Sequence, residues 1–187
     1  MNYPNKSKKE KVVLKTSASK RGMTLEEDIN NTNAYYREND IAFIYKKPTP
    51  ITLVHVDYPS RSAAKITEAY FNEPSTTDYN GIYKEKYIDF EAKECHSKTS
   101  FPFSSIHVHQ IKHLENVLRH GAIAFIIIRM TYYDETYLLF AKDFLEYYNN
   151  TSRKSLPYEW IKENSYKISY NYIRPVDYLK IIDRYCL

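Results

Sequence analysis

Residues 86–93 alternate between apolar and polar side chains, which is the pattern of a β-strand that buries one face. The apolar face of this strand would carry Ile88, Phe90 and Ala92, and the polar face Tyr87, Asp89, Glu91 and Lys93. Residues 78–83 predict a partner strand, and Lys84 and Glu85 predict the turn between the two strands. Such a hairpin would bring Asp78, at its open end, back towards the polar face of the first strand.

The segment before this hairpin predicts one amphipathic helix. Thr24 and Glu27 have the spacing of a capping box, so a helix should start there and run to about Glu38. Its inward face would carry Leu25, Ile29 and Tyr36.

Residues 41–45 predict a buried strand. Two prolines then interrupt regular structure, and we expect an extended stretch at 51–56 and a short helix at 62–71. This material separates the first strand from the hairpin. We therefore interpret residues from about 47 to 74 as an insertion.

The second half of the chain predicts a crossover unit. Residues 106–119 have one apolar helical face, and Gly121 ends the helix. Residues 122–128 are apolar throughout, as expected for a strand buried on both faces. With strand 86–93 they predict a right-handed parallel crossover. We expect the remaining elements to be a strand at 137–140 and helices at 143–148, near 158–163 and after Pro175. The fold class is α/β, with a mixed central sheet flanked by helices.

The chain of 187 residues fits a single domain, residues 21–187, which is large enough to bury roughly 70% of its unfolded surface. Residues 1–21 carry a net charge of +6 and the whole chain +4, so the remainder carries −2. We expect residues 1–20 to form a disordered basic tail suited to phosphate backbones. A solubilising terminus without a specific role is the alternative.

Composition also excludes several classes of protein. No apolar run approaches the roughly 20 residues of a membrane span, and the lysine-rich N-terminus lacks the apolar segment of a secretory signal. Cys95 and Cys186 are far apart and form no disulfide framework, so we expect a reducing, cytoplasmic location. With 3 glycines, the chain has no loop of the kind that cradles phosphates.

Asp78, Glu91 and Lys93 form the most informative constellation. Two carboxylates repel each other unless a cation lies between them, and Mg²⁺ takes oxygen ligands while keeping waters for a phosphate to share. A neighbouring lysine can orient the attacking water or stabilise charge on the phosphate. Phosphodiester hydrolysis fits this set best. An exposed ion pair on a surface hairpin is the alternative.

A second set of residues suggests a zinc site. The candidate ligands are Cys95, His96, His107, His109 and His113. His109 and His113 have the spacing of helical ligands, but Cys95 has no nearby second cysteine to complete a structural site. We therefore favour the carboxylate constellation over zinc.

Longer segments around these residues are more specific than the acid–lysine triplet alone. They comprise residues 21–26 (RGMTLE), 46–50 (KKPTP), 58–64 (YPSRSAA), 74–81 (PSTTDYNG), 87–94 (YIDFEAKE), 98–102 (KTSFP) and the HVHQ that ends at Gln110. In these segments the chain closely resembles the RecU family of bacterial Holliday-junction resolvases, within the PD-(D/E)xK nuclease superfamily. The resemblance runs from about residue 21 to the C-terminus.

The resemblance implies a restriction-endonuclease-like fold in which the insertion is a protruding stalk. It also implies an endonuclease that uses Mg²⁺, with Mn²⁺ as a substitute, and acts on four-way junction DNA as a homodimer. Asp78 and Glu91 would ligate the metal with the Ala92 carbonyl, and Lys93 would position the water or stabilise the transition state.

Further site residues follow from the same resemblance. Thr76 is favoured over Thr77 as a metal-site hydroxyl, and Gln110 belongs to the metal site, where a capping or surface glutamine is the alternative. Glu26 matches an acid that approaches the metal from the first helix, although an acid in a first helical turn needs no such role.

The expected DNA contacts are Arg21, Lys46, Lys47, Arg61 and Lys65. For the last four of these residues, the alternative is an ordinary solvated charge that makes no DNA contact. We expect only two of the four to contribute to DNA binding. A recombinase and a branch-migration complex are further expected partners. The competing hypothesis is a non-catalytic protein that binds junctions or modulates recombination.

Overall fold

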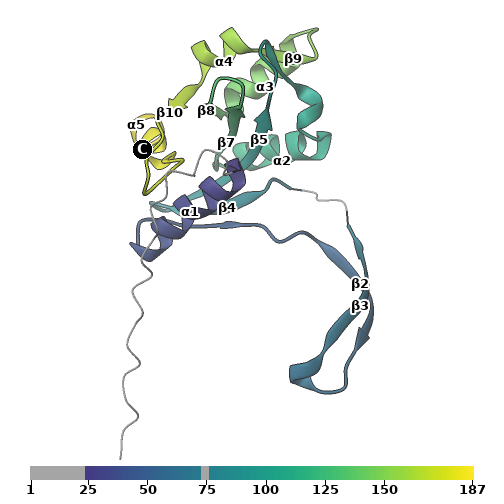
Figure 1. Ribbon diagram of the computed structural model, residues 1–187. Coiled ribbons are helices and arrows are strands. Elements are labelled where there is room, and N and C mark those ends of the chain that lie inside the picture. The colour runs from purple at the N-terminus through teal and green to yellow at the C-terminus, as the bar shows by residue number, and fades with distance from the viewer. Residues whose placement is uncertain (1–23, 73–75) are drawn as a thin grey trace, which may run out of the picture.

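A computed structural model describes residues 24–72 and 76–187 (Figure 1). The described residues form a six-stranded sheet in the order β1-β4-β5-β7-β8-β10, and only the β5–β7 pairing within it is parallel. Its strands are β1 (Phe43–Lys46), β4 (Tyr79–Tyr83), β5 (Lys86–Cys95), β7 (Ile123–Met130), β8 (Glu135–Phe140) and β10 (Tyr166–Ile168). The expected α/β class with a mixed sheet is confirmed.

Helices cover both faces of this sheet. They are α1 (Leu25–Glu38), α2 (Val108–Arg119), α3 (Ala141–Asn150), α4 (Tyr158–Asn164) and α5 (Leu179–Tyr185). Two small strands, β6 (Ser100–Pro102) and β9 (Ser155–Pro157), pair with each other beside the 3-10 turn η2 (Phe103–Ser105). Apart from the helix predicted at 62–71, the predicted helices are present, and their ends agree with the prediction to within a few residues.

Each face of the sheet has its own apolar core. Under α1 and α5, the rings of Tyr79, Phe90 and Phe125 stack in a row with centroid distances of 4.8 Å and 4.7 Å. Under α2, α3 and α4, the alternate side chains of β7, such as Ile126 and Ile128, are fully buried. Burial of β7 on both faces is the pattern predicted from its apolar sequence.

Local sequence signals fix the ends of α1 and of the β4–β5 hairpin. Thr24 and Glu27 form the predicted capping box, in which each side chain binds the other residue's backbone N–H. Lys84 and Glu85 both have positive φ, at 46° and 63°, so the tight turn lies where the sequence predicts it.

The crossover unit is also confirmed. β5 leads through α2 to β7, and the two strands pair in parallel with Glu91 opposite Ile126. Consecutive parallel strands need a crossover connection, and α2 lies across the face of the sheet that carries Glu91, because Gln110 of α2 contacts that residue. This arrangement brings residues of α2 to the polar side chains of β5.

The insertion is an extended hairpin rather than a strand followed by a helix. β2 (Ile51–Asp57) pairs antiparallel with β3 (Lys65–Phe71), and the 3-10 turn η1 (Arg61–Ala63) lies at its tip. The helix predicted at 62–71 is therefore wrong. The residues of β3 include β-branched and aromatic types that suit strands, and pairing with β2 satisfies their backbone groups. The hairpin projects away from the body as a stalk (Figure 1).

The first strand was predicted to be buried, but it is buried on one face only. β1 is an edge strand of the sheet, and its burial alternates: Ile44 is buried, whereas Phe43 is 51% exposed. The apolar run at 41–45 therefore covers the core with one face only. Apolar residues on the other face of an edge strand leave an open surface.

The predicted basic tail, with Arg21, lies outside the described residues. Among the described helices, none has the length and apolar character that crossing a membrane requires.

Candidate active site

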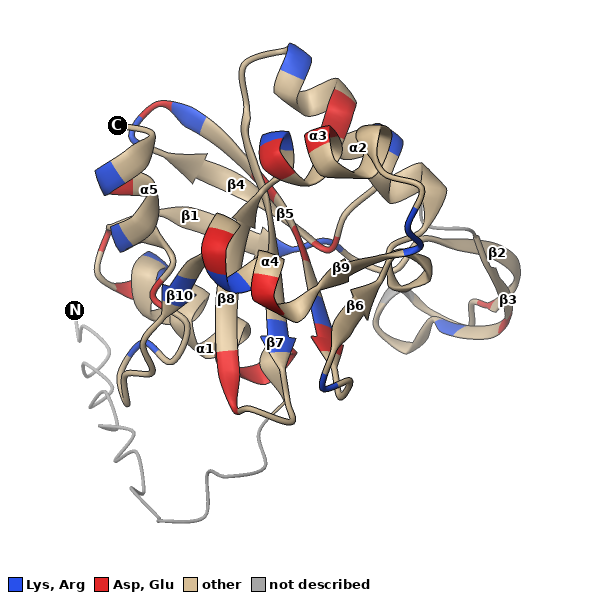
Figure 2. Ribbon diagram, turned by 90° about the horizontal axis from the view of Figure 1, so that it is seen from above, with Lys and Arg blue, Asp and Glu red and all other residues tan. Residues whose placement is uncertain are grey.

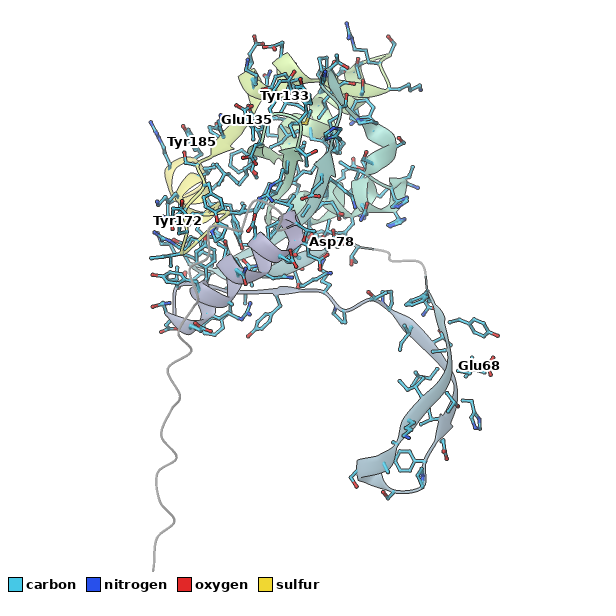
Figure 3. The ribbon with its side chains drawn as sticks, in the orientation of Figure 1. Glu68, Asp78, Tyr133, Glu135, Tyr172 and Tyr185 are labelled. Carbon is cyan, nitrogen blue, oxygen red and sulfur yellow. The ribbon has the colours of Figure 1, made fainter. Side chains whose placement is uncertain are left out.

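Asp78 and Glu91 face each other across the β4–β5 hairpin. Asp78 immediately precedes β4, and the register pairs Tyr79 with Phe90, so the next pair outward is Asp78 with Glu91. The Asp78 carboxylate lies close enough to share a hydrogen bond with a protonated Glu91. Figure 3 shows Asp78 at the point where the chain returns from the stalk to the body. The proximity expected from the hairpin is confirmed.

Glu91 is fully buried, although it lies on the polar face of its strand. Gln110 Nε2 donates a hydrogen bond of 2.8 Å to Glu91 Oε2, and Lys93 Nζ lies 2.6 Å from Oε1. The lysine contact is an ion pair without hydrogen-bond alignment, and among the described residues Oε1 has no hydrogen-bond donor. Burial raises the pKa of Glu91 to about 8; Asp78 adds to the rise and the charge of Lys93 opposes it.

This combination of features suits a cation. A buried carboxylate with an unsatisfied oxygen beside a second carboxylate is destabilised when both are ionised, and a bound cation removes that penalty. Ligands from two carboxylates and neutral oxygens, with waters completing the shell, are typical for a hard divalent ion. The residues present therefore fit a divalent metal, which the carboxylates of Asp78 and Glu91 could hold.

The two threonines before Asp78 have different surroundings. The Thr77 hydroxyl is buried and donates to the Asp89 carboxylate, so it is committed to that partner. The Thr76 hydroxyl makes one long contact of 3.4 Å to the Thr77 carbonyl. The Thr76 hydroxyl is therefore less committed to a partner than that of Thr77, and its role at a metal stays a prediction.

Gln110 has the capping role that the sequence offers as one alternative, and it also contacts Glu91. It is buried near the start of α2, and its Oε1 accepts the His107 backbone N–H at 2.9 Å as part of a capping box. Its Nε2 reaches Glu91 from the same position. In this arrangement Gln110 orients Glu91, and a direct metal contact would require its oxygen to leave the cap.

Glu26 lies near the site but contacts a different partner. Its carboxylate forms an exposed ion pair of 2.5 Å with Lys46 Nζ. Burial first, and then the charges of Glu26, Asp78 and Glu91, raise the pKa of the Tyr79 hydroxyl. The three acids therefore act on one hydroxyl group, which places Glu26 in the electrostatic neighbourhood of the candidate site.

The sequence gives a fourth acid of this region, Asp89, no role beyond its place on the polar face. Its side chain is 0% exposed and its carboxylate contacts Lys47, Thr77, Tyr87 and His113. The signal that could have found it is its two-residue spacing from Glu91. That spacing puts both carboxylates on the face that α2 covers.

The predicted DNA contacts fall into separate regions. Lys46 and Lys47 lie at the base of the stalk, near the candidate site, whereas Arg61 begins the turn at its tip and Lys65 begins β3. Lys47 differs from the others, because its side chain is 17% exposed and already bound to Asp89.

The zinc hypothesis gains no support. His113 contacts Asp89 at 3.2 Å, His96 contacts Thr131, and the Cys95 thiol donates to the Ser100 carbonyl at 3.6 Å. In residues 24–72 and 76–187, no group of three or more His, Cys, Asp or Glu residues is placed to hold a metal ion. A metal at Asp78 and Glu91 would therefore depend on neutral oxygens and water for its other ligands.

Comparison with known proteins assigns the family. A family model described as Recombination protein U matches residues 20–184. The Holliday junction resolvase RecU of Oceanobacillus iheyensis is 53% identical over 193 residues, covering 98% of this chain and 98% of that protein. Proteins of the same name from Bacillus cereus and Bacillus thuringiensis are 51% and 52% identical, covering 97% and 91% of this chain and 92% and 87% of their own lengths. The chain therefore belongs to the Recombination protein U (RecU) family.

Proposed function

We propose that this chain is a divalent-metal-dependent endodeoxyribonuclease that resolves four-way (Holliday) junctions by paired nicks during DNA recombination and repair. The observation that carries the proposal is the buried Glu91 carboxylate, which faces Asp78 and is held by Gln110 and Lys93. The chain belongs to a family whose relatives are named Holliday junction resolvases, and this constellation suits the hydrolysis of a phosphodiester.

We propose Mg²⁺ as the metal, with Mn²⁺ as a substitute, because the candidate ligands are all oxygen atoms. Asp78 and Glu91 would bind it, assisted by Thr76 and the Ala92 carbonyl. When bound, such an ion polarises the scissile phosphate and lowers the pKa of water at its surface. Gln110 keeps Glu91 in place through its 2.8 Å hydrogen bond. We propose Glu26, now paired with Lys46, as a further acid of the site.

Lys93 has a role that depends on the carboxylates beside it. Its ammonium group lies 2.6 Å from Glu91 Oε1 and is partly exposed, so it can reach a phosphate or an attacking water. A cation at this position stabilises the negative charge that develops on the phosphate oxygens in the transition state. We therefore assign Lys93 to orientation of the water and stabilisation of the transition state.

The stalk supports a homodimer. Figure 2 shows β2–β3 with few charged positions, and many of its apolar side chains are exposed, up to 83% for Phe71. A two-stranded hairpin is marginally stable by itself, so a partner that covers these side chains is expected. Paired nicks in opposing strands require two sites related by two-fold symmetry. A second copy of the chain would supply the second site and also cover the apolar side chains of the stalk.

We propose that Lys46, Arg61 and Lys65 contact DNA phosphates, together with Arg21 before α1. Figure 1 shows the stalk projecting from the body, which is the shape required to enter the centre of an open junction. Readout by backbone geometry should then dominate over base sequence. A substrate of chromosomal DNA implies the bacterial cytoplasm, where a recombinase and a branch-migration complex are the expected partners.

Cleavage of a labelled synthetic four-way junction tests the proposal. Wild-type protein with Mg²⁺ should introduce symmetric nicks, and a linear duplex of the same sequence should remain uncut. Binding of the junction without nicking, under both Mg²⁺ and Mn²⁺, would instead identify a non-catalytic protein that modulates recombination.

A further inference from the structure

A second buried carboxylate lies two residues before Glu91 on the same face of β5. Asp89 is 0% exposed, and each of its neighbours offers a donor to its carboxylate. The contacts are Lys47 Nζ at 2.9 Å, Tyr87 Oη at 3.0 Å, His113 Nε2 at 3.2 Å and the Thr77 hydroxyl. These donors belong to the base of the stalk, the residue before Asp78, β5 itself and α2.

Lys47 holds the segment that carries Asp78 from two sides. Its backbone N–H donates to the Asp78 carbonyl at 2.7 Å, and its Nζ donates to the Thr77 hydroxyl and to Asp89, both at 2.9 Å. The main chain of Asp78 is thereby held between a strand partner and an ion pair whose carboxylate is fully buried. Movement of Lys47 would displace Asp78 directly.

Lys47 lies at the base of the stalk, just before the short segment that leads into β2. Pro48 and Pro50 follow it, and a proline has a fixed φ that stiffens the connection to β2. The two stalk strands are closed at this end by the Asn72 N–H, which donates to the Pro50 carbonyl at 3.0 Å. The base of the stalk therefore connects through a short, stiff segment to the lysine that holds Asp78.

Stability alone gives no reason to bury this ion pair. Exchange of a buried ion pair for apolar residues of similar volume is often neutral or stabilising, because both charges must be desolvated. The pair does offer a specific geometry, since four donors converge on one carboxylate and fix the segments that carry them. In metal sites, residues that hydrogen-bond to the metal ligands hold those ligands in a fixed orientation in the same way.

We propose that Asp89 and Lys47 are positioning residues that hold Asp78 at the metal site and tie the base of the stalk to it. The inference rests on the proposed metal site at Asp78 and Glu91. It assigns Lys47 to positioning instead of phosphate contact, and it separates Lys47 from its neighbour Lys46, whose Nζ binds Glu26 on the exposed side.

The test uses Lys47→Met, Asp89→Asn and the double variant in the full-length protein. Calorimetric titration with Mn²⁺ in the absence of DNA should show metal affinity reduced roughly 10- to 100-fold in each single variant, the range for partners of metal ligands. Single-turnover cleavage of bound junction should fall by a similar factor. The double variant should lose no more Mn²⁺ affinity than the more strongly affected single variant, because the effects of two residues that act through one contact do not add.

Junction affinity separates positioning from DNA binding. Lys47→Met should bind the junction with wild-type affinity and an unchanged dependence on salt, whereas Lys46→Ala should lower both. Lys162→Met serves as the matched control for loss of a lysine, since its ion pair with Glu159 lies on the surface of α4. That control should keep wild-type metal affinity and cleavage.

Three results would overturn the inference. They are wild-type Mn²⁺ affinity in Lys47→Met, losses that add in the double variant, and a fall of roughly 0.9 in the salt slope of Lys47→Met, which would mark a phosphate contact. If Asp89→Asn unfolds at the assay temperature, the Mn²⁺ affinity of Lys47→Met alone decides whether the positioning role holds. Cleavage by Asp78→Asn would refute the proposed site, whereas a normal Lys47→Met beside an inactive Asp78→Asn refutes only the positioning role.

Discussion

Lys93 Nζ lies 2.6 Å from Oε1 of Glu91, a carboxylate buried two residues earlier on the same face of β5. The lysine is thus the cation nearest to an oxygen that has no hydrogen-bond donor among the described residues. Its charge lowers the cost of ionising Glu91. In the proposed reaction, the same ammonium group would also stabilise the negative charge that develops on the phosphate.

Lys93→Ala should lower the single-turnover cleavage rate by roughly 10²-fold or more, because the lost contact is strongest in the transition state. Junction affinity should change little, and gel-shift titrations would measure it in parallel. Lys162→Ala is the control for loss of a surface lysine. Equal losses in affinity and rate would make Lys93 a docking residue.

Asp78→Asn should abolish cleavage while leaving junction binding intact or slightly tighter. A carboxylate about 4 Å from a cation contributes about 4 kcal/mol at an effective dielectric near 20, enough to control metal occupancy. Loss of one anion near the DNA also reduces repulsion of phosphate. Cleavage and binding assays at several Mg²⁺ concentrations measure both effects; normal cutting by this variant would remove Asp78 from the site.

The pKa of about 8 at Glu91 predicts pH-dependent metal binding. Below pH 8 the metal must displace a proton from Glu91, so affinity should rise about tenfold per pH unit and level off above pH 8. Titration calorimetry in buffers of different ionisation enthalpy would detect the released proton. Glu91→Gln should remove both the proton release and the rise in affinity.

The same pKa predicts a trend in stability for the metal-free protein. Glu91 keeps its proton when folded up to about pH 8 but loses it when unfolded near its ordinary value of 4.5. The unfolded state therefore binds fewer protons in this window, and stability should fall as the pH rises from about 4.5 to 8. Thermal melting should show that Glu91→Gln is less sensitive to pH over this range.

Gly81→Ala should destabilise the fold through β1. A Cβ at Gly81 would lie 2.5 Å from the Ile44 Cα and closer still to the Phe43 carbonyl, so the backbone of β1 would have to move. We expect a loss of about 3 kcal/mol in unfolding free energy, measured by urea denaturation. Gly121→Ala is the control: it has open space and a φ of +83°, so strain of about 1 kcal/mol should be its whole effect.

Arg61→Ala tests whether the tip of the stalk reads the junction. A residue at the junction centre has no equivalent contact on linear DNA, so the variant should lose preference for four-way junctions over duplex. Lys46→Ala, at the stalk base, should weaken binding to both substrates alike. Affinities for both DNAs at several salt concentrations measure the difference, and equal losses in Arg61→Ala would reduce Arg61 to a general phosphate contact.

Much of the fold follows from local signals in the sequence. The capping box at Thr24, the hairpin turn at Lys84 and the alternation along β5 each depend on residues a few positions apart, so the sequence by itself determines them. The same hairpin register brings Asp78 opposite Glu91, which made the candidate carboxylate pair predictable. The helix predicted at 62–71 failed because its pattern is ambiguous until β2 pairs with β3.

Only the tertiary structure decides which polar residues are buried. On the strand alone, Asp89, Glu91 and Lys93 share one polar face, and nothing local distinguishes an exposed ion pair from a metal site. Packing of α2 across this face buries both carboxylates and delivers Gln110 and His113 to them. Lys47 likewise becomes a half-buried partner of Asp89 through a contact between residues 42 positions apart in sequence. Desolvation depends on all neighbouring segments at once, so burial, the raised pKa of Glu91 and the setting of the site come from the fold.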